Sequence, residues 1–528
     1  MTRRLLAFGA LLAIIAVPFV VRPRGASPVP VPMIDRQAGA TERLVIITPH
    51  NEAVRDEFGR AFRERMAAQG RHVEIDWRTP GGTSEIARYL ASEYTASFRH
   101  HWTNTLGRAW SARIAAGFMT APPANAPPAP GDEVTAARDA FLTSDVGCGL
   151  DVYFGGGSVE HSRHARAGRL VDAGLVSTRP DLFGPEGIPQ QLGGQALWDK
   201  QGRWMGACIA SFGMCVNHDG LKRLGVATPT SWAAMADPRL HDQVGLADPS
   251  KSGSVGKAFE NIIQSQMARA GVEGGWAAAM RLIRRIGGNA RYFTDNAAKV
   301  ALDVSAGDAA VGTCIDYYGR FERETLRAIG DGDRVDYVAP RGETALDADP
   351  ISLLRGAAHR ELAVAFIAFV LSDEGQKLWA FKRGAPGGPQ RYTLARLPIT
   401  PRLYDDAFAA ARADLGENPY DPGGRLDYHE AWTGPLFGAI AFVVRAMCVD
   451  TEPELKAAYR ALGDAHFPPR ATALFDDLTL VDHATVSGPI AAALRAADPL
   501  AEAAWSRRLV DHHRALYQKV AALARAGQ

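Results

Sequence analysis

The order of local patterns along this chain constrains its fold more than any other feature. A short β-rich run at residues 44–47 is followed by a polar loop and then by a helical pattern that begins at residue 52. The strand-like stretch HVEIDW and the helical stretch EIARYLASEY repeat this order at residues 72–94. Strands that alternate with helices favour an α/β fold with a parallel sheet. Because the chain has 528 residues, too many for one compact core, we expect two or three domains.

The N-terminal residues indicate where the protein works. Arg3 and Arg4 precede an apolar run at residues 5–21, and basic residues follow it. A positive start before an apolar stretch is typical of an export signal, although the same pattern also fits a retained N-terminal anchor. We therefore assign residues 1–24 to an export signal or anchor and residues 25–41, rich in Pro, Ala and Gly, to a flexible lead-in. The body of the protein is expected outside the cytoplasmic membrane, and no later stretch reads as a membrane span.

Two further regions break the alternating pattern. Residues 94–140 hold a helical stretch and a Pro/Ala-rich loop, and we interpret them as an insertion. Residues 401–528 are rich in alanine and helical in pattern, with no strand of note, which predicts a C-terminal helical extension.

Composition and motifs exclude several classes of function. The formal net charge is +1 and there is no long basic run, so a nucleic-acid partner is not expected. The chain has no G-x-S-x-G or H-E-x-x-H motif, and GSVGKAF lacks the glycine spacing of a phosphate-binding loop. We therefore predict that the protein is not an enzyme. The five cysteines form no C-x-x-C motif and are expected to be buried free thiols: Cys148, Cys208, Cys215, Cys314 and Cys448.

Five loops follow predicted strands and are candidates for ligand contact, at residues 48–52, 80–85, 155–160, 248–254 and 316–319. In an open α/β sheet, ligands bind beyond the carboxyl ends of the strands, where helix N-termini present free N–H groups. Each loop alone is equally explained by helix capping or packing, but together they predict a cleft for a small polar or anionic ligand. The candidate ligand-binding residues are His50, Asn51, Gly82, Thr83, Ser84, Gly155, Gly156, Ser211, Ser252, Ser254, Tyr317 and Tyr318.

The adjacent tyrosines in DYYG raise a stereochemical question. Tyr317 and Tyr318 come directly after an apolar strand-like run. Neighbours on a strand point to opposite faces, so two adjacent tyrosines on a strand would not share one core face. Half-buried packing explains either residue alone, and a ligand that both phenols reach explains the pair.

Three longer segments resemble one protein family in order along the chain. They are DVYFGGG, TPTSWAAMADPRLHDQVGLADPSKSGS, and the stretch from YVAPRGETALDADPISLLRG to LSDEGQ. Together they resemble the periplasmic solute-binding proteins of ABC importers, in the branch that holds ferric-ion and aminoethylphosphonate binders. The resemblance covers roughly residues 42–400, without the insertion and the extension.

The resemblance implies a fold of two α/β lobes joined by crossing strands, the type II periplasmic binding protein fold. Residues 42–210 would form mainly lobe 1, residues 211–318 mainly lobe 2, and residues 319–400 would return to lobe 1 and add closing helices. The stretch CIASFGMCVN would be a crossing strand with Gly213 near the hinge. An interaction role for the extension is a separate hypothesis, under which its removal leaves ligand affinity intact.

The resemblance also implies a function. The protein would capture a solute in the periplasm as a monomer and deliver it to an ABC permease in the inner membrane. In ferric-binding members two adjacent tyrosines coordinate iron, and some members add a histidine from the first loop. The resemblance therefore implies Tyr317, Tyr318 and His50 as metal ligands. It also implies Fe(III) as cargo, not as a catalytic cofactor. Gly156 stands where a carboxylate often lies, so an anionic organic solute such as a phosphonate or carboxylate is the alternative. An exported enzyme or scaffold that uses the same lobes is the alternative from another class.

Overall fold

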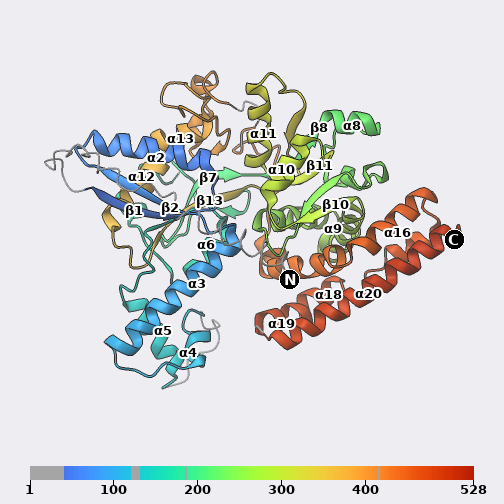
Figure 1. The fold of residues 1–528 in the computed structure, drawn as a ribbon, viewed down its shortest axis with the longest axis horizontal. Coiled ribbons are helices and arrows are strands. Elements are labelled where there is room, and N and C mark those ends of the chain that lie inside the picture. The colour runs from blue at the N-terminus through green and yellow to red at the C-terminus, as the bar shows by residue number, and fades with distance from the viewer. Residues whose placement is uncertain (1–40, 121–130, 185–186, 414–416, 497) are drawn as a thin grey trace, which may run out of the picture.

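The computed structural model describes residues 41–120, 131–184, 187–413, 417–496 and 498–528, and it contains two separate large β-sheets (Figure 1). The predicted export signal, nearly all of the lead-in and most of the Pro/Ala-rich loop lie outside these residues. The first sheet, the centre of lobe 1, has the order β14-β7-β13-β3-β1-β2, with β4 paired to β13. Its strands are β1 Glu42–Ile47, β2 Val73–Arg78, β3 Val152–Phe154, β4 Leu170–Val171, β7 Met205–Ala210, β13 Asp347–Leu354 and β14 Leu397–Pro398.

The second sheet, the centre of lobe 2, has the order β10-β9-β11-β8-β12. Its strands are β8 Phe212–Asn217, β9 Val244–Ala247, β10 Ala290–Thr294, β11 Val311–Ile315 and β12 Val335–Val338. Strand β1 is parallel to β2 and β3, and β9 is parallel to β10 and β11, as the alternating pattern predicts. Strands β13 and β8 run antiparallel to their neighbours, so both sheets are mixed. The expectation of two α/β lobes is confirmed.

Two crossing segments join the lobes. Strand β7 belongs to the first sheet and β8 to the second, and Ser211 alone separates them. The chain returns from β12 to β13, later than residue 319, where the resemblance implied the return. The reason is pairing: β12 is antiparallel to β8, which keeps residues 335–338 in lobe 2.

Helices that carry one apolar face cover lobe 1. On α2 (Glu52–Ala67), Phe58 and Phe62 are fully buried and meet Phe366 and Phe369 of α12 (Arg360–Leu371). Helix α13 (Asp373–Ala380) adds Trp379, whose ring centroid lies 4.4 Å from that of Phe58. This aromatic layer contacts His50 in the loop after β1 through Trp379, and Phe154 at the end of β3 through Phe58.

The predicted insertion is continuous with a helix of lobe 1. Helix α3 (Thr83–His100) runs out of the lobe into η1 (His101–Thr105), α4 (Ala112–Gly117) and α5 (Glu133–Thr143), which project from the body in Figure 1. Phe98 of α3 stacks on Phe118 and meets Phe141 edge-on, so the projection has an aromatic core of its own.

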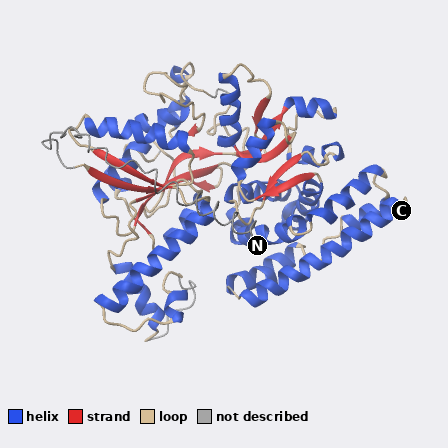
Figure 2. Cartoon of the chain, in the orientation of Figure 1, coloured by secondary structure: helices blue, strands red, loops and turns tan. Residues whose placement is uncertain are grey.

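The C-terminal region is helical, as expected, but it is not a separate module. After a linking segment without long helices it forms α14 Glu430–Thr433, α15 Phe437–Val444, η7 Arg445–Val449, α16 Glu452–Asp464, α17 Pro469–Phe475, α18 His483–Thr485, α19 Ala491–Ala496 and α20 Pro499–Arg525 (Figure 2). Helices α14, α15, η7, α16 and α18 pack on α9 (Gly253–Gly288), and α20 packs on α16 and α17. One buried cluster joins Trp276 and Ile283 of α9 with Tyr459 and Tyr517. The extension therefore shares the core of lobe 2.

One helical stretch in the described residues, Glu430–Val449, is long and apolar enough to cross a membrane by length and composition. Most of it is buried inside the protein, against α9. A buried core helix of a globular protein passes the same test, and burial here explains its apolar character. The cysteines agree with expectation, since all five are free and buried.

Candidate functional site

A cavity of about 760 Å³ lies between the lobes and gathers most of the predicted site residues. Lobe 1 lines it with the loops before α2, α3 and α6 (Ser158–Arg166), and lobe 2 lines it with the loops before α9, α10 (Ala297–Ala306) and α11 (Asp316–Ala328). The predicted residues that line it are His50, Asn51, Gly82, Thr83, Ser84, Gly156, Ser252, Ser254, Tyr317 and Tyr318. The hydroxyl of Ser84 donates to the carbonyl of Lys251 at 3.3 Å, so the lobes touch beside this cavity.

Two predicted residues do not line the cavity. Gly155 lies beneath His50, and a Cβ on it would come within 2.6 Å of the imidazole ring, so it supports that ring instead. Ser211 is buried at the β7–β8 crossing, where its hydroxyl is 2.9 Å from that of Tyr337. Both residues are next in sequence to residues that line the cavity, Gly156 in one case and Ala210 and Phe212 in the other, but do not line it themselves.

Six helices begin at this cavity. Their N-cap residues all line it: Asn51, Gly82, Gly157, Ser252, Asn296 and Ile315. The first N–H groups of a helix have no partner within the helix, and the N-terminus carries a partial positive charge. At α3, α6 and α11 no side chain caps these groups. The backbone alone therefore makes the cavity a favourable place for an anion.

The tyrosine pair lies at the start of α11, not on the preceding strand. Strand β11 ends at Ile315 and the helix begins at Asp316. Successive residues of a helix are about 100° apart instead of on opposite faces, so both rings reach the cavity, with centroids 5.2 Å apart. The Tyr317 hydroxyl is buried and has no hydrogen-bond partner in the described part of the chain. Burial raises the pKa of both phenols, so both are neutral at pH 7.

Arg396 is the charged residue at the base of the cavity, and no pattern in the sequence indicated it. Its side chain is 1% exposed and donates from Nη1 to Asp349 Oδ2 at 2.6 Å. The guanidinium lies between the rings of Tyr317 and Trp379, at 5.1 and 5.3 Å from their centroids. Its Nε and Nη2 are buried without a hydrogen-bond partner among the described residues. Arginine keeps its charge when buried and offers a fork of donors that suits phosphate and carboxylate groups.

His50 takes part in the same cluster. Its Nε2 is 3.1 Å from Asp349 Oδ2 and 3.4 Å from Nη1 of Arg396. Burial lowers the pKa of His50, although Asp349 opposes this, and the ring is neutral at pH 7. Burial opposes ionisation of Asp349, but Arg396 and His50 outweigh it and hold its pKa below the usual range. The cluster is thus an arginine–aspartate pair with a neutral imidazole beside it.

The expected metal ligands lie close together, but a cation accompanies them. His50, Tyr317 and Tyr318 all line the cavity, and Arg396 stands between His50 and the Tyr317 ring. Among the described residues there is no group of three or more His, Cys, Asp and Glu side chains arranged to hold a metal ion. Asp349 balances the charge of Arg396, but the Nε and Nη2 groups of Arg396 remain without a partner among the described residues, and such donors suit the acceptor oxygens of an anion better than a metal cation.

The structure explains why glycine occupies position 156. The backbone there has φ +114°, and a Cβ would lie 2.1 Å from the hydroxyl of Tyr153. The Gly156 N–H donates to Asp349 Oδ1 at 2.9 Å. A carboxylate side chain therefore does not fit at this position, and the carboxylate of Asp349 lies there from β13 instead.

Sequence reasoning also missed the residues that close the other end of the cavity. Lys257 and Asp347 line it from α9 and β13, and Phe437 lines it from the extension. Asp347 and Asp349 stand in the segment DADP that carries the family resemblance, so the resemblance was the available signal for them. Nothing in the sequence pointed to Phe437, because its contact with the cleft depends on how the extension folds back.

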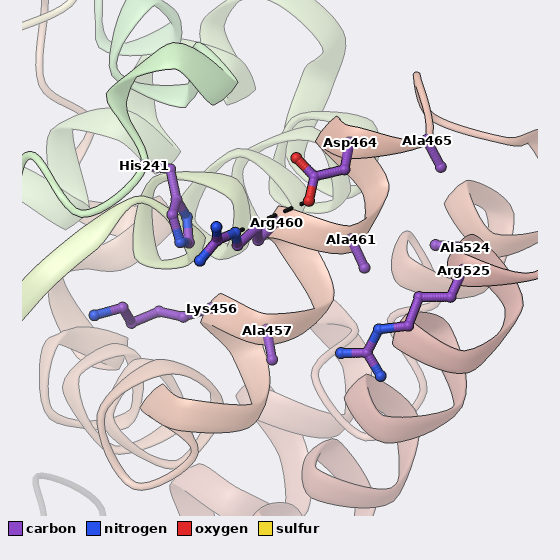
Figure 3. Close-up of a pocket in the computed structure, with 9 residues that line it drawn as sticks. All are labelled: His241, Lys456, Ala457, Arg460, Ala461, Asp464, Ala465, Ala524 and Arg525. Atoms are coloured by element: carbon purple, nitrogen blue, oxygen red, sulfur yellow. Dashed lines mark ion pairs between the residues drawn. The ribbon is translucent and has the colours of Figure 1, made fainter.

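A separate hollow of about 640 Å³ lies on the outside of lobe 2, between α16 and α20 (Figure 3). Basic side chains dominate its lining, with His241, Lys456, Arg460 and Arg525 around the acidic Asp464. Lys456 is paired with Asp242 at 2.6 Å. This hollow shares no residue with the interlobe cavity.

This chain is similar to known proteins over part of its length. Residues 169–400 match the family described as bacterial extracellular solute-binding protein. An uncharacterized protein of Haemophilus influenzae is 27% identical over 177 residues, which cover 33% of this chain and 46% of that protein. The phosphoglycerate transport regulatory protein PgtC of Salmonella typhimurium is 22% identical over 211 residues, 40% of this chain and 47% of PgtC. The chain thus spans about half the length of these relatives.

Among solved structures, the periplasmic binding protein AfuA from Actinobacillus pleuropneumoniae, with exogenous fructose-6-phosphate bound, aligns with a TM-score of 0.48 and 18% identity. That alignment covers 79% of this chain and 97% of AfuA. The segment that matches the family, residues 169–400, runs from β4 to β14 and contains both crossing segments. Over those residues the chain is similar to the bacterial extracellular solute-binding proteins.

Proposed function

We propose that this protein is the solute-binding component of an ABC-type importer and that its interlobe cavity captures an anionic organic solute. The observation that carries the proposal is Arg396, a buried guanidinium whose Nε and Nη2 have no partner among the described residues. Six helix N-termini converge on the same cavity and add to its preference for negative charge. A phosphonate, phosphate ester or carboxylate has the charge and acceptor oxygens for this environment.

The remaining parts of the proposal follow from the family match. A protein that only binds and delivers a solute needs no catalytic group. We therefore propose that this chain is not an enzyme. We propose that it works in the periplasm as a monomer and delivers its solute to a permease in the inner membrane. Hinged closure of the two lobes over the ligand would use the crossings at Ser211 and at residues 339–346.

Ferric ion, free or complexed, is the second candidate. The observation that favours it is the pair of phenols at the cavity wall, with the Tyr317 hydroxyl unpartnered in the described part of the chain. Bound Fe(III) would lower the pKa of a phenol enough to ionise it. Arg396 opposes this, since the cation would lie close to the metal, unless an anion bound with the iron separates the charges.

Titration calorimetry separates the two candidates. Iron-free protein is titrated with inorganic phosphate, 2-aminoethylphosphonate, citrate and Fe(III)-citrate. We expect at least one iron-free anion to bind, and Arg396→Lys to weaken it at least tenfold, because lysine keeps the charge but loses the fork of donors. Arg113→Lys, at an exposed arginine far from the cavity, serves as the control.

Two results would contradict the proposal of an anionic organic solute. One is an absence of binding by every iron-free anion. The other is tight binding of Fe(III) with a visible tyrosinate–iron absorption band that Tyr317→Phe abolishes. The second result would establish iron as the cargo instead.

A further inference from the structure

A second cavity of about 540 Å³ adjoins the first and is built with the help of the extension. Val159, Lys257 and Phe437 line both cavities, so these three side chains form the boundary between them. Lobe 1 contributes α6 and the hairpin of β5 (Gln191–Leu192) and β6 (Gln195–Ala196). The extension contributes Tyr428 and Phe437.

The extension is fixed at this place by contacts to both lobes. The Tyr428 N–H donates to the carbonyl of Gly193 in the hairpin at 2.9 Å. The Tyr428 hydroxyl donates to Glu260 Oε1 of α9 at 2.8 Å. The second cavity is therefore a built feature with three walls, not a gap between loosely placed segments.

The chemistry of the boundary differs from that of the first cavity. The Lys257 ammonium is 2.9 Å from Glu260 and 4.0 Å from Asp347, and it lies 4.7 Å from the ring centroid of Tyr428 and 5.5 Å from that of Phe437. Its charge is thus matched by neighbouring carboxylates. Arg396 is also paired with a carboxylate, but its Nε and Nη2 have no partner among the described residues, so the anion of the ligand belongs at Arg396.

Gln195 is the side chain that points to a ligand in the second cavity. It is 6% exposed and lines the cavity, yet its amide makes no hydrogen bond to any described residue. The amide atoms of Gln195 are not among the buried polar atoms that lack a partner, so the amide is open to the cavity, where a bound molecule can reach it. Trp204 and Phe437 add aromatic surface to the same cavity. An amide beside aromatic rings suits an uncharged polar group with apolar faces.

We infer that the solute has two parts, an anionic group held in the first cavity and an uncharged hydroxyl- or amide-bearing part held in the second against Gln195 and Phe437. This inference rests on the proposed capture of an anion. It assigns the C-terminal extension a role in selecting the ligand, because Phe437 and Tyr428 form a wall that lobes 1 and 2 alone would lack.

The test compares the affinities of four probes by titration calorimetry: inorganic phosphate, glycerol 3-phosphate, myo-inositol 1-phosphate and uridine 5′-monophosphate. We expect one of the two larger compounds to bind at least tenfold tighter than inorganic phosphate. Gln195→Leu and, separately, Phe437→Leu should remove most of this advantage, and Gln195→Leu, at a residue that lines only the second cavity, should leave the affinity for phosphate within about twofold. Gln190→Leu alters a neighbouring glutamine that does not line the cavity and should change neither.

Failure of this inference is distinguishable from failure of the proposed function. If phosphate binds and both larger compounds bind no tighter, or if their advantage survives both substitutions, the two-part ligand is refuted while anion capture stands. If none of these probes binds and 2-aminoethylphosphonate and citrate do not bind either, anion capture itself is refuted and the inference falls with it. Thermal melting of each variant identifies any that is unfolded. If either Gln195→Leu or Phe437→Leu is unfolded, the affinities of the other variant test the inference.

Discussion

At the scale of single residues, burial sets the protonation states beneath the cleft. Asp316, the first residue of α11, is fully buried, and its Oδ1 accepts the N–H of Tyr317 at 2.8 Å. Burial raises its pKa to about 6, although Arg320 and Arg396 oppose the shift. Between these two pKa values Asp316 is therefore protonated in the folded protein and ionised in the unfolded chain.

This shift predicts a pH-dependent effect of Asp316→Asn. The ordinary pKa is 3.8, so between pH 4 and 6 the folded protein holds a proton that the unfolded chain loses, and stability falls as the pH rises. Above pH 6 Asp316 is ionised in both states, and its burial then lowers the free energy of unfolding by roughly 2 to 3 kcal/mol. We expect Asp316→Asn to raise the melting temperature at pH 7 by several degrees and to change it little at pH 3.5.

Melting curves at the two pH values check this prediction. Asp333→Asn replaces an exposed aspartate of the same lobe and should leave the melting temperature unchanged at both. An equal effect of Asp316→Asn at pH 3.5 and pH 7 would show that ionisation of Asp316 is not its cause.

At the scale of elements, the β5–β6 hairpin decides how the extension meets lobe 1. Gly194 in its turn has φ +79°, and a Cβ there would lie 2.0 Å from the carbonyl oxygen of Tyr428. The glycine thus serves two purposes, a left-handed backbone conformation and a close approach of two chain segments. The neighbouring Gly193 carbonyl accepts the Tyr428 N–H, which completes the junction.

Gly194→Ala should therefore be more damaging than an ordinary glycine replacement. Gly174 provides a matched control, with φ +76° and no atom within 4 Å of its added Cβ. Backbone strain alone costs about 1 kcal/mol for Gly174→Ala, whereas Gly194→Ala adds displacement of Tyr428 and should cost roughly 2 to 4 kcal/mol. Urea unfolding of both variants measures the difference, and equal losses would mean that the extension is not held by this turn.

At the scale of the whole molecule, the extension and lobe 2 form one folding unit. Helix α20 packs against α16 and α17 and contributes Leu509 and Tyr517 to the cluster that contains Trp276 of α9. The Trp276 indole donates to the carbonyl of Val481 at 2.9 Å. Contrary to the hypothesis of a separable interaction module, we expect removal of the extension to weaken ligand binding, because it would expose the core of a lobe that lines the binding cavity.

Two leucines on α20 test this unity with one kind of substitution. Leu509 is fully buried and Leu500 is 82% exposed. Leu509→Ala should cost about 2 to 5 kcal/mol and weaken ligand binding as lobe 2 loosens, and Leu500→Ala should stay within about 0.5 kcal/mol of the parent. Denaturant unfolding followed by tryptophan fluorescence gives both values. If Leu509→Ala were as mild as Leu500→Ala, the extension would not be part of the core.

The sequence by itself determined the class of fold and the loops of the site. Strand, loop and helix patterns are local, since they depend on side-chain spacing of two or about four residues, and they predicted an α/β fold with a parallel sheet and the helical extension. The division into two lobes was implied by the family resemblance. The loop positions followed from the same patterns, because a ligand site of an open sheet lies where its strands end. Most of the residues named in those loops do line the cavity.

Only the tertiary structure decided which charge lies in the site and what the extension does. Arg396 reaches the cavity because β14 pairs with β7, and Phe437 reaches it because α15 packs on α9. These contacts join residues far apart in the chain, so no spacing in the sequence encodes them. The adjacent tyrosines both reach the cavity because the chain changes from strand to helix at Asp316. The opposite wall of that cavity comes from lobe 1, which only the tertiary structure brings there.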